Sequence, residues 1–464
     1  MPDLARIFKT YDVRGLVPDE LDETAGRAIG AAFARLDTRG ADANPARRPA
    51  VIVGHDMRPT SPGLAQGFAA GVEDAGRDVL LIGLAATDQV YFASGSLDAP
   101  AVMVTASHNP SAYNGFKLCL AGAVALSAGT GLDEIRDDVV AVMSRTPRLD
   151  GPWRRRGSAR SADLLPSYVD HLHHVSPVNG RRLKVVVDAA NGMAGLTAPA
   201  VFARLDVDLV PLYFELDGTF PNHDANPLVP ANLCDVSAAV VAERADLGLA
   251  FDGDADRCFV VDELGHPVSP SVVTSLIAIR ELARHPGGRV IHNLITSRAV
   301  PEVIRAHGGV PVRTPVGHSL IKAEMARTGA VFGGEHSGHY YFRDFWNADS
   351  GMLAALHVMS VLAARDEPIS RIAGSLSPYV ASGEINLTVS SPADAMARLE
   401  DRYAGREAVE MDRLDGLSVI GKDWWFNVRA SNTEPLLRLN VEASDEATMA
   451  DVRDSTLALL RSET

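Results

Sequence analysis

The stretch from Leu247 to Asp262, LGLAFDGDADRCFVVD, places a dense group of charges between two apolar segments. Residues 247–251 have the length and composition of a buried strand, and residues 258–261 have the pattern of a second one. Aspartates occupy alternate positions in the loop between these strands: Asp252, Asp254 and Asp256. Carboxylates this close together repel one another unless a cation lies among them, so the sequence predicts a divalent metal site.

An EF-hand is the first alternative for this segment, because Glu263 follows the aspartates at the spacing of that motif. Arg257 occupies the position where the calcium loop requires glycine, and the following residues form a strand pattern, so the EF-hand is rejected. Three carboxylates leave coordination sites open for water or a phosphate oxygen, which suits Mg²⁺. A solvated acidic turn remains as the second alternative.

Apolar runs of strand length, each followed by a stretch with helical spacing, recur along the chain. This alternation is typical of an α/β protein, and it predicts a separate sheet for each third of the chain. After about Ser375 the apolar residues alternate as in antiparallel strands, which predicts a smaller α+β unit. The strand-like runs before that point are residues 50–54, 101–105, 183–188, 247–251 and 289–293.

The length of 464 residues fits about three domains at roughly 150 residues each, with room for a small fourth one. A segment rich in Pro, Gly, Ser and Arg, residues 145–163, interrupts the pattern and is predicted to be a solvated linker. A softer boundary is expected near Gly265. The predicted domains are 1–150, 160–263, 264–374 and 375–464.

The composition excludes several classes of protein. With 44 Lys and Arg against 59 Asp and Glu, the net charge of -15 argues against binding to nucleic acid or to an anionic membrane. The three cysteines, Cys119, Cys234 and Cys258, are scattered and predict neither a disulfide framework nor a zinc site. The longest apolar run, residues 352–364, is too short to span a bilayer. We expect a soluble, cytoplasmic protein.

A second motif, TASHNP at residues 105–110, lies at the end of a predicted strand and continues to Asn114-Gly115. Asn-Pro and Asn-Gly favour turns, so Ser107 is expected on an exposed loop. There it could act as a nucleophile or carry a phosphate, with His108 or Lys117 as proton acceptor or charge partner. For this pair alone, a serine that caps a following helix is the favoured alternative.

Two further motifs carry polar groups suited to a sugar phosphate. The glycine-rich segment at residues 333–339 offers hydrogen-bonding groups to a polyhydroxy ligand, and the segment at residues 429–435 has the composition of a phosphate-binding loop. Taken alone, each is equally well explained as a polar turn. The groups in question are Glu335, Ser337 and His339 in the first segment, and Arg429, Ser431, Asn432 and Thr433 in the second.

The four motifs in this order resemble the α-D-phosphohexomutase family, specifically its phosphomannomutase/phosphoglucomutase branch. The resemblance covers nearly the whole chain and includes the segments at residues 11–15, YDVRG, and 54–59, GHDMRP. It implies a heart-shaped molecule of three similar mixed α/β domains and a smaller C-terminal α+β domain, with one loop from each domain meeting in a central cleft.

The resemblance also implies roles for individual residues. Ser107 would be the phosphoserine, and the three aspartates would hold one Mg²⁺ together with a phosphate oxygen of that serine. Glu335, Ser337 and His339 would bind the sugar, and Arg429, Ser431, Asn432 and Thr433 would bind the phosphate that does not react. Arg14, Lys117, Arg257 and His318 also match functional positions, and the choice of Lys117 or His318 as general base stays open.

The implied reaction moves a phosphoryl group between O1 and O6 of a hexose phosphate, mannose or glucose or both, by way of phosphoserine. A hexose 1,6-bisphosphate would be intermediate and activator. Two alternatives remain: a metal-dependent sugar phosphatase that uses Ser107 as a transient acceptor, and a catalytically silent sugar-phosphate sensor. No nucleic acid or membrane partner is expected, and a monomer or a homodimer fits equally well.

Overall fold

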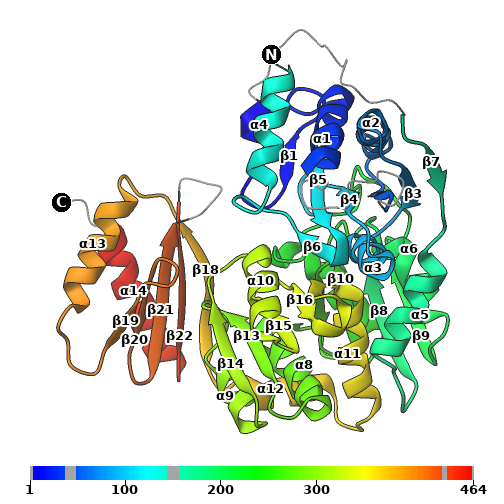
Figure 1. Cartoon of the computed structure of the whole chain (residues 1–464). Helices are drawn as coiled ribbons and strands as arrows, with labels where there is room; N and C mark the ends of the chain where they lie inside the picture. The colour runs from blue at the N-terminus through cyan, green and yellow to red at the C-terminus, as the bar shows by residue number, and fades with distance from the viewer. Residues whose placement is uncertain (1–3, 37–48, 144–155, 431–435, 462–464) are drawn as a thin grey trace.

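The computed structural model describes residues 4–36, 49–143, 156–430 and 436–461, which form four sheets in chain order. Figure 1 shows the C-terminal sheet, in orange and red, to one side of the other three. The first three sheets mix parallel and antiparallel strands, and the fourth is antiparallel. The predicted α/β fold class with a smaller α+β unit at the C-terminus is confirmed.

The first sheet has the order β1-β5-β4-β2-β3-β7, with the short β6 paired to β5. Its strands are β1 (Val13–Leu16), β2 (Val51–His55), β3 (Val79–Leu84), β4 (Ala101–Val104), β5 (Tyr113–Leu120), β6 (Val124–Ala125) and β7 (Ala159–Ser161). Its helices are η1 (Leu4–Ile7), α1 (Glu23–Leu36), α2 (Ser61–Asp74), α3 (Thr87–Leu97), η3 (Ala121–Ala123) and α4 (Leu132–Met143).

The second sheet has the order β12-β11-β10-β8-β9. Its strands are β8 (Leu183–Asp188), β9 (Val207–Leu212), β10 (Leu247–Phe251), β11 (Cys258–Val261) and β12 (Pro267–Val268). The helices of this unit are α5 (Leu165–Val175), α6 (Ala194–Phe202), η4 (Pro230–Leu233) and α7 (Cys234–Glu243).

The third sheet has the order β14-β13-β15-β16-β17. Its strands are β13 (Arg289–Asn293), β14 (Val310–Thr314), β15 (Phe332–Gly334), β16 (Tyr340–Phe342) and β17 (Ala348–Asp349). Its helices are α8 (Pro270–Arg284), α9 (Ala299–Ala306), α10 (His318–Thr328), η5 (Arg343–Phe345), α11 (Gly351–Ala363) and α12 (Ile369–Leu376).

These three sheets share one arrangement of strands. Three parallel strands are followed by two antiparallel ones in the spatial orders β3-β2-β4-β5-β1, β9-β8-β10-β11-β12 and β14-β13-β15-β16-β17. The strand-like runs that recur along the sequence therefore belong to a structural repeat. In each repeat, the loop after the last parallel strand leads into an antiparallel partner.

The fourth sheet has the order β18-β22-β21-β20-β19, and two helices belong to its unit. The elements are β18 (Val380–Leu387), α13 (Pro392–Tyr403), β19 (Glu410–Asp412), β20 (Leu417–Ile420), β21 (Trp424–Ala430), β22 (Leu437–Ala443) and α14 (Glu446–Arg461). This unit has its own apolar core, whereas one continuous buried cluster includes residues of the first three units, such as Ile52, Val185 and Phe332.

Two predicted boundaries differ from the strand pairing. The segment expected to be a solvated linker ends in β7, which pairs with β3 and extends the first sheet past residue 150. The boundary expected at residue 263 falls in the turn of a hairpin, because β12 pairs with β11 in the second sheet. In both cases backbone hydrogen bonding to an earlier strand outweighs the local turn signals. The exact domain limits stay a prediction.

Glycines allow a close contact between α1 and α2 in the first unit. A Cβ atom on Gly30 would lie 2.1 Å from the carbonyl oxygen of Phe68, and one on Gly71 would lie 2.0 Å from that of Arg27. Backbone therefore packs against backbone here. Within the described ranges, none of the helices combines the length and apolar character needed to cross a membrane.

We predict that Gly71→Ala lowers the free energy of unfolding by about 1–3 kcal/mol, because the added methyl group overpacks the α1–α2 contact. Gly374→Ala is the matched control, since a Cβ at Gly374 in α12 meets nothing within 4 Å. The control should be neutral or stabilise by up to about 1 kcal/mol. Urea and thermal unfolding measure both, and equal effects of the two substitutions would contradict the packing argument.

Candidate active site

Three loops at equivalent positions of the repeated sheets carry most of the predicted site residues. They follow β4, β10 and β15, the last parallel strand of each repeat, and span residues 105–112, 252–257 and 335–339. Ligand sites in α/β proteins form at the carboxyl ends of such strands. The shared strand order therefore brings chemistry-bearing loops from three different parts of the chain to corresponding places.

Ser107 and the aspartate loop lie in direct contact. The Ser107 hydroxyl donates to Oδ2 of Asp252 at 2.9 Å, and Nδ1 of His108 lies 3.2 Å from the same oxygen of Ser107. The loop of Ser107 leads into β5, so no helix follows for it to cap.

The predicted exposure of Ser107 is wrong: only 5% of the residue is exposed. The aspartate loop covers it, and a Cβ on Gly253 would lie 2.5 Å from the Ser107 carbonyl oxygen. Turn signals in the sequence place a residue on a loop, but they carry no information about which other loop packs against it.

The three aspartates are buried and converge. Asp252, Asp254 and Asp256 each offer a carboxylate oxygen, and these oxygens lie within 4.8 Å of one another. Nζ of Lys117 lies 2.7 Å from Oδ2 of Asp254 and 2.5 Å from Oδ2 of Asp256. Nε of Arg257 lies 2.8 Å from Oδ2 of Asp252. Two cations thus partly neutralise three buried anions.

The pKa values of these groups reflect burial opposed by charge. Burial raises the pKa of Asp252 to about 6, although Arg257 lowers it. Burial also disfavours the charge of Asp256, but Lys117 and His339 together bring its pKa well below the ordinary value. For Lys117, burial lowers the pKa, but the neighbouring carboxylates outweigh burial and raise the net value. Burial and neighbouring charge therefore shift the pKa values of Asp252 and Asp256 in opposite directions within one loop.

The donor set fits a hard divalent cation. Asp254 is fully buried, and within the described part of the chain no group donates a hydrogen bond to its Oδ1 atom. A buried carboxylate oxygen without a donor is costly unless a cation satisfies it. Oxygen ligands at this spacing suit Mg²⁺ better than softer metals.

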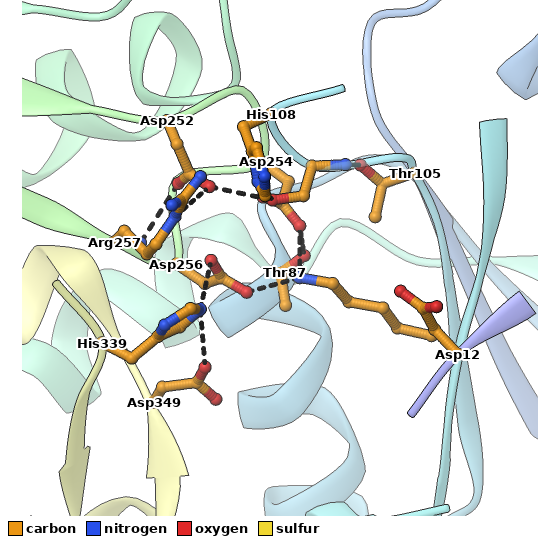
Figure 2. A network of polar contacts seen from close by, with 12 residues as sticks. Asp12, Thr87, Thr105, His108, Asp252, Asp254, Asp256, Arg257, His339 and Asp349 are labelled. Carbon is orange, nitrogen blue, oxygen red and sulfur yellow. Dashed lines mark hydrogen bonds and ion pairs between the residues drawn. The ribbon is translucent and has the colours of Figure 1, made fainter. Parts of the chain in front are cut away.

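His339 links the aspartate loop to the third unit. Figure 2 shows its ring between Asp256 and Asp349, with Nε2 3.5 Å from Oδ1 of Asp256 and 3.8 Å from Oδ2 of Asp349. Its Nδ1 lies 2.9 Å from the Ser337 hydroxyl. Arg257 and His339 also form an isolated β-bridge, so backbone pairing fixes the two loops to each other.

Glu335 is held in a fixed orientation by several donors. Its Oε2 accepts from the hydroxyl of Tyr341 at 2.6 Å and from that of Ser337 at 3.3 Å, and its Oε1 accepts from the Gly317 amide at 3.2 Å. The residue is 2% exposed. The structure therefore brings Glu335, Ser337 and His339 together, and their role in sugar binding stays a prediction.

Arg14 lies beside the serine loop. Its guanidinium donates to Oδ1 of Asn109 at 2.5 Å and to Oδ2 of Asp12 at 2.5 Å. It therefore joins β1 to the loop that carries Ser107.

The remaining predicted site residues belong to the fourth unit and to the start of α10. Arg429 at the end of β21 donates to Glu384 at 3.1 Å, and Ser431, Asn432 and Thr433 lie outside the described residues. His318 begins α10, and its side chain also lies outside the description. Burial lowers the pKa of His336, in the loop at residues 335–339; of the nearby charges, Glu384 raises it and Arg429 lowers it.

Several residues around the site were not singled out from the sequence. The Thr87 hydroxyl donates to Oδ2 of Asp254 at 2.6 Å, and Lys322 lies 2.6 Å from Asp349, which faces His339. Arg58 reaches the backbone of the serine loop. Arg58 lies in the segment GHDMRP, which is part of the family resemblance. Thr87 and Lys322 lie in segments where no sequence pattern indicated a role in the site.

Asp88 joins the first three units through hydrogen bonds. It lies in α3 and accepts through Oδ2 from the hydroxyl of Tyr168 in α5 at 2.7 Å and from that of Ser350, before α11, at 2.6 Å. Burial raises the pKa of Asp88 to about 7.

Four family models match successive parts of the chain between residues 5 and 459. The phosphoglucomutase/phosphomannomutase alpha/beta/alpha domains I, II and III match residues 5–144, 166–265 and 272–379, and the C-terminal domain of that family matches residues 384–459. The order of the matches follows that of the four sheets.

Relatives that align over nearly the whole chain belong to the same family. The chain is 38% identical over 464 residues to a phosphomannomutase of Escherichia coli strain K12, covering 98% of this chain and 99% of the relative. It is 40% identical over 456 residues to phosphohexose mutases of Xanthomonas campestris pv. campestris, covering 98% of each. The crystal structure of a phosphoglucomutase/phosphomannomutase family protein from Burkholderia thailandensis aligns with a TM-score of 0.88 at 33% identity, covering 99% of this chain and 98% of that one.

We predict that Mg²⁺ raises the thermal unfolding midpoint of the protein and that Asp254→Asn abolishes this rise. Binding to the folded state alone stabilises it by about 2.7 kcal/mol when Mg²⁺ exceeds Kd 100-fold. Asp235→Asn, which changes an exposed aspartate that accepts from Tyr213, is the control and should keep the response. An equal rise for Asp254→Asn would place the ion elsewhere.

We predict that the contribution of Asp88 to the free energy of unfolding depends on pH. Because folding raises the pKa of Asp88 from 3.8 to about 7, the folded state binds this proton more tightly than the unfolded chain. This contribution to stability therefore falls as the pH rises from about 4 to about 7. Asp88→Asn keeps an oxygen acceptor for both hydroxyls and removes the titration. Urea unfolding at pH 5 and pH 8 should show the variant gaining stability relative to the parent at the higher pH, and a constant difference would contradict the assignment.

Proposed function

The chain belongs to the phosphoglucomutase/phosphomannomutase family of isomerase-class phosphotransferases, and we propose that it interconverts mannose 6-phosphate and mannose 1-phosphate. Glucose phosphates are the second proposed substrate pair, because one group of relatives at 40% identity carries the broader name phosphohexose mutases. The phosphoryl group would pass between O1 and O6 through Ser107 and a hexose 1,6-bisphosphate.

The contact between Ser107 and Asp252 is the observation that carries this proposal. A hydroxyl from the first unit lies 2.9 Å from a carboxylate of the second, within a group of three converging aspartates. A phosphoryl group on the Ser107 oxygen would therefore lie beside the carboxylates that are suited to share a cation with it. A solvated acidic turn would not need a buried serine at this place.

In the proposed site, Asp252, Asp254 and Asp256 would hold Mg²⁺ together with a phosphate oxygen on Ser107. When bound, Mg²⁺ supplies positive charge that offsets the meeting of two phosphates and polarises the transferred group. Phosphoserine carries about -1.5 to -2 at neutral pH. Arg14, Lys117 and Arg257 would add positive charge around the same point, since all three contact the serine or the aspartate loop.

Lys117 and His318 are both retained as candidates for the general acid and base. Lys117 extends from β5 to two of the aspartates, so its ammonium lies beside the proposed phosphoryl position. The carboxylates keep this ammonium protonated, and in that state it would act as an acid toward an alkoxide and stabilise negative charge. His318 opens α10, near the Gly317 amide that donates to Glu335.

The sugar and the distal phosphate would bind on the third and fourth units. Glu335, Ser337 and His339 would accept and donate hydrogen bonds to sugar hydroxyls that occupy similar places in both orientations of the substrate. Arg429, with Ser431, Asn432 and Thr433, would bind the phosphate that does not react. Such a site must accept a phosphate at either end of the bisphosphate, so that the intermediate can turn and return its other phosphate to Ser107.

We predict that Ser107→Ala abolishes isomerisation of both sugars, because no phosphoryl carrier remains. The assay follows mannose 1-phosphate and glucose 1-phosphate separately, each with a trace of hexose 1,6-bisphosphate. Faster conversion of one sugar assigns the main substrate. Ser337→Ala is the comparison variant, and it should weaken sugar binding while leaving Ser107 able to accept a phosphoryl group.

Measuring inorganic phosphate in the same reactions separates the mutase from a phosphatase. A mutase releases almost none per sugar isomerised, whereas a phosphatase releases one phosphate per sugar consumed. A sugar-phosphate sensor would bind the sugars without converting either. Parental isomerisation rates in Ser107→Ala would overturn the proposal.

A further inference from the structure

Every N–H group of the Arg58 guanidinium donates a hydrogen bond, either to the Asp56 carboxylate or to a backbone carbonyl oxygen. Its Nε donates to Oδ2 of Asp56 at 3.2 Å, and its four remaining N–H groups donate to backbone carbonyl oxygens. These acceptors and distances are Ser107 at 2.8 Å, Asn109 at 2.7 Å, Pro110 at 2.9 Å and Tyr113 at 3.1 Å. One guanidinium therefore binds the whole turn between β4 and β5.

The guanidinium is enclosed from several directions. Arg58 is 1% exposed and Asp56 is fully buried, so the charge is balanced locally. The ring of Phe220, from the second unit, lies 5.1 Å from the guanidinium carbon. A Cβ on Gly218 would lie 2.4 Å from the Cα of Arg58, which shows how closely this segment covers the arginine.

The backbone of Ser107 needs such support. Ser107 has a φ of +51°, a left-handed conformation that costs a non-glycine residue free energy. Its backbone amide donates to the Thr105 hydroxyl at 2.9 Å, and its carbonyl oxygen accepts from Arg58 at 2.8 Å. The Arg58 bond to the Ser107 carbonyl opposes relaxation of this residue toward an ordinary turn.

We propose that Arg58 is a positioning residue for phosphoryl transfer, which fixes the Ser107 loop so that the serine oxygen is aligned with the sugar hydroxyl. This inference rests on the proposed role of Ser107 as phosphoryl carrier. The hydrogen bonds of the Arg58 guanidinium go to Asp56 and to backbone carbonyl oxygens, and its ring contact goes to Phe220. Its proposed action is therefore through the geometry of the loop and not through contact with substrate. Lysine cannot replace it, because a single ammonium has three donors and no planar fork.

Loss of Arg58 should change which acceptor receives the phosphoryl group, a sugar hydroxyl or water. A misplaced loop slows transfer to a bound sugar hydroxyl strongly, because that step needs alignment of two fixed groups. Attack by water is less affected, because a mobile water adapts to the displaced phosphoserine. The ratio of inorganic phosphate released to sugar isomerised should therefore rise.

The test compares Arg58→Lys with Arg77→Lys, which changes another buried arginine of the first unit, one that donates to the Pro49 carbonyl far from the serine loop. For Arg58→Lys we expect kcat to fall on the order of 10²-fold, with KM changed less than about threefold, and the phosphate ratio to rise at least about tenfold. Arg77→Lys should keep the parental kcat and ratio. The ratio does not depend on how much of the protein is folded, so a structural defect alone leaves it unchanged.

Phe220→Leu provides a second, milder variant in case Arg58→Lys does not fold. It removes the aromatic ring from the guanidinium but none of the hydrogen bonds, and we expect the ratio to rise about threefold. A parental ratio in a folded Arg58→Lys protein, or in Phe220→Leu if the lysine variant is unfolded, overturns this inference. Mass spectrometry of the parent protein treated with hexose 1,6-bisphosphate tests the other premise, since an unphosphorylated Ser107 would overturn the proposed function instead.

Discussion

The burial of three carboxylates beside one serine hydroxyl is the constraint on which the rest of the site depends. Asp252, Asp254 and Asp256 are almost completely shielded from water, and such a group of anions is unfavourable without nearby cations. Lys117 from the first unit and Arg257 from the aspartate loop provide part of that charge. The need to neutralise these anions therefore ties the first and second units together at the proposed place of a divalent cation and a phosphate.

The repeated strand order explains how three distant segments of sequence reach corresponding places. In each of the first three sheets, the chemistry-bearing loop follows the last parallel strand, so the same topology positions a serine, an aspartate cluster and the loop proposed to bind the sugar. The three loops occupy equivalent positions in their sheets and differ in amino-acid composition. Close backbone contacts, such as the one that Gly253 permits at the Ser107 carbonyl, lock neighbouring loops together. The fourth unit has an apolar core of its own.

Much of this arrangement was accessible from the sequence because its signals are local. The apolar run before Asp252 predicts β10, and the polar turn after it predicts the aspartate loop, both of which the structure contains. Whether a loop residue is buried or exposed was not predictable in the same way. Ser107 sits in a turn by its sequence, yet it is covered by a loop 145 residues away. Arg58 likewise has no local signal that separates a surface arginine from one bound to four carbonyl oxygens.

The sequence by itself determined the α/β class, the antiparallel C-terminal unit and the residue types available for phosphate and metal chemistry, because these follow from short-range periodicity and composition. Tertiary structure alone decided that β7 and β12 complete earlier sheets, that His339 lies between Asp256 and Asp349, and that one guanidinium fixes the serine loop. Such contacts join residues far apart in the chain. Their free energy depends on distance and burial in the folded molecule, and neither quantity is encoded in neighbouring residues.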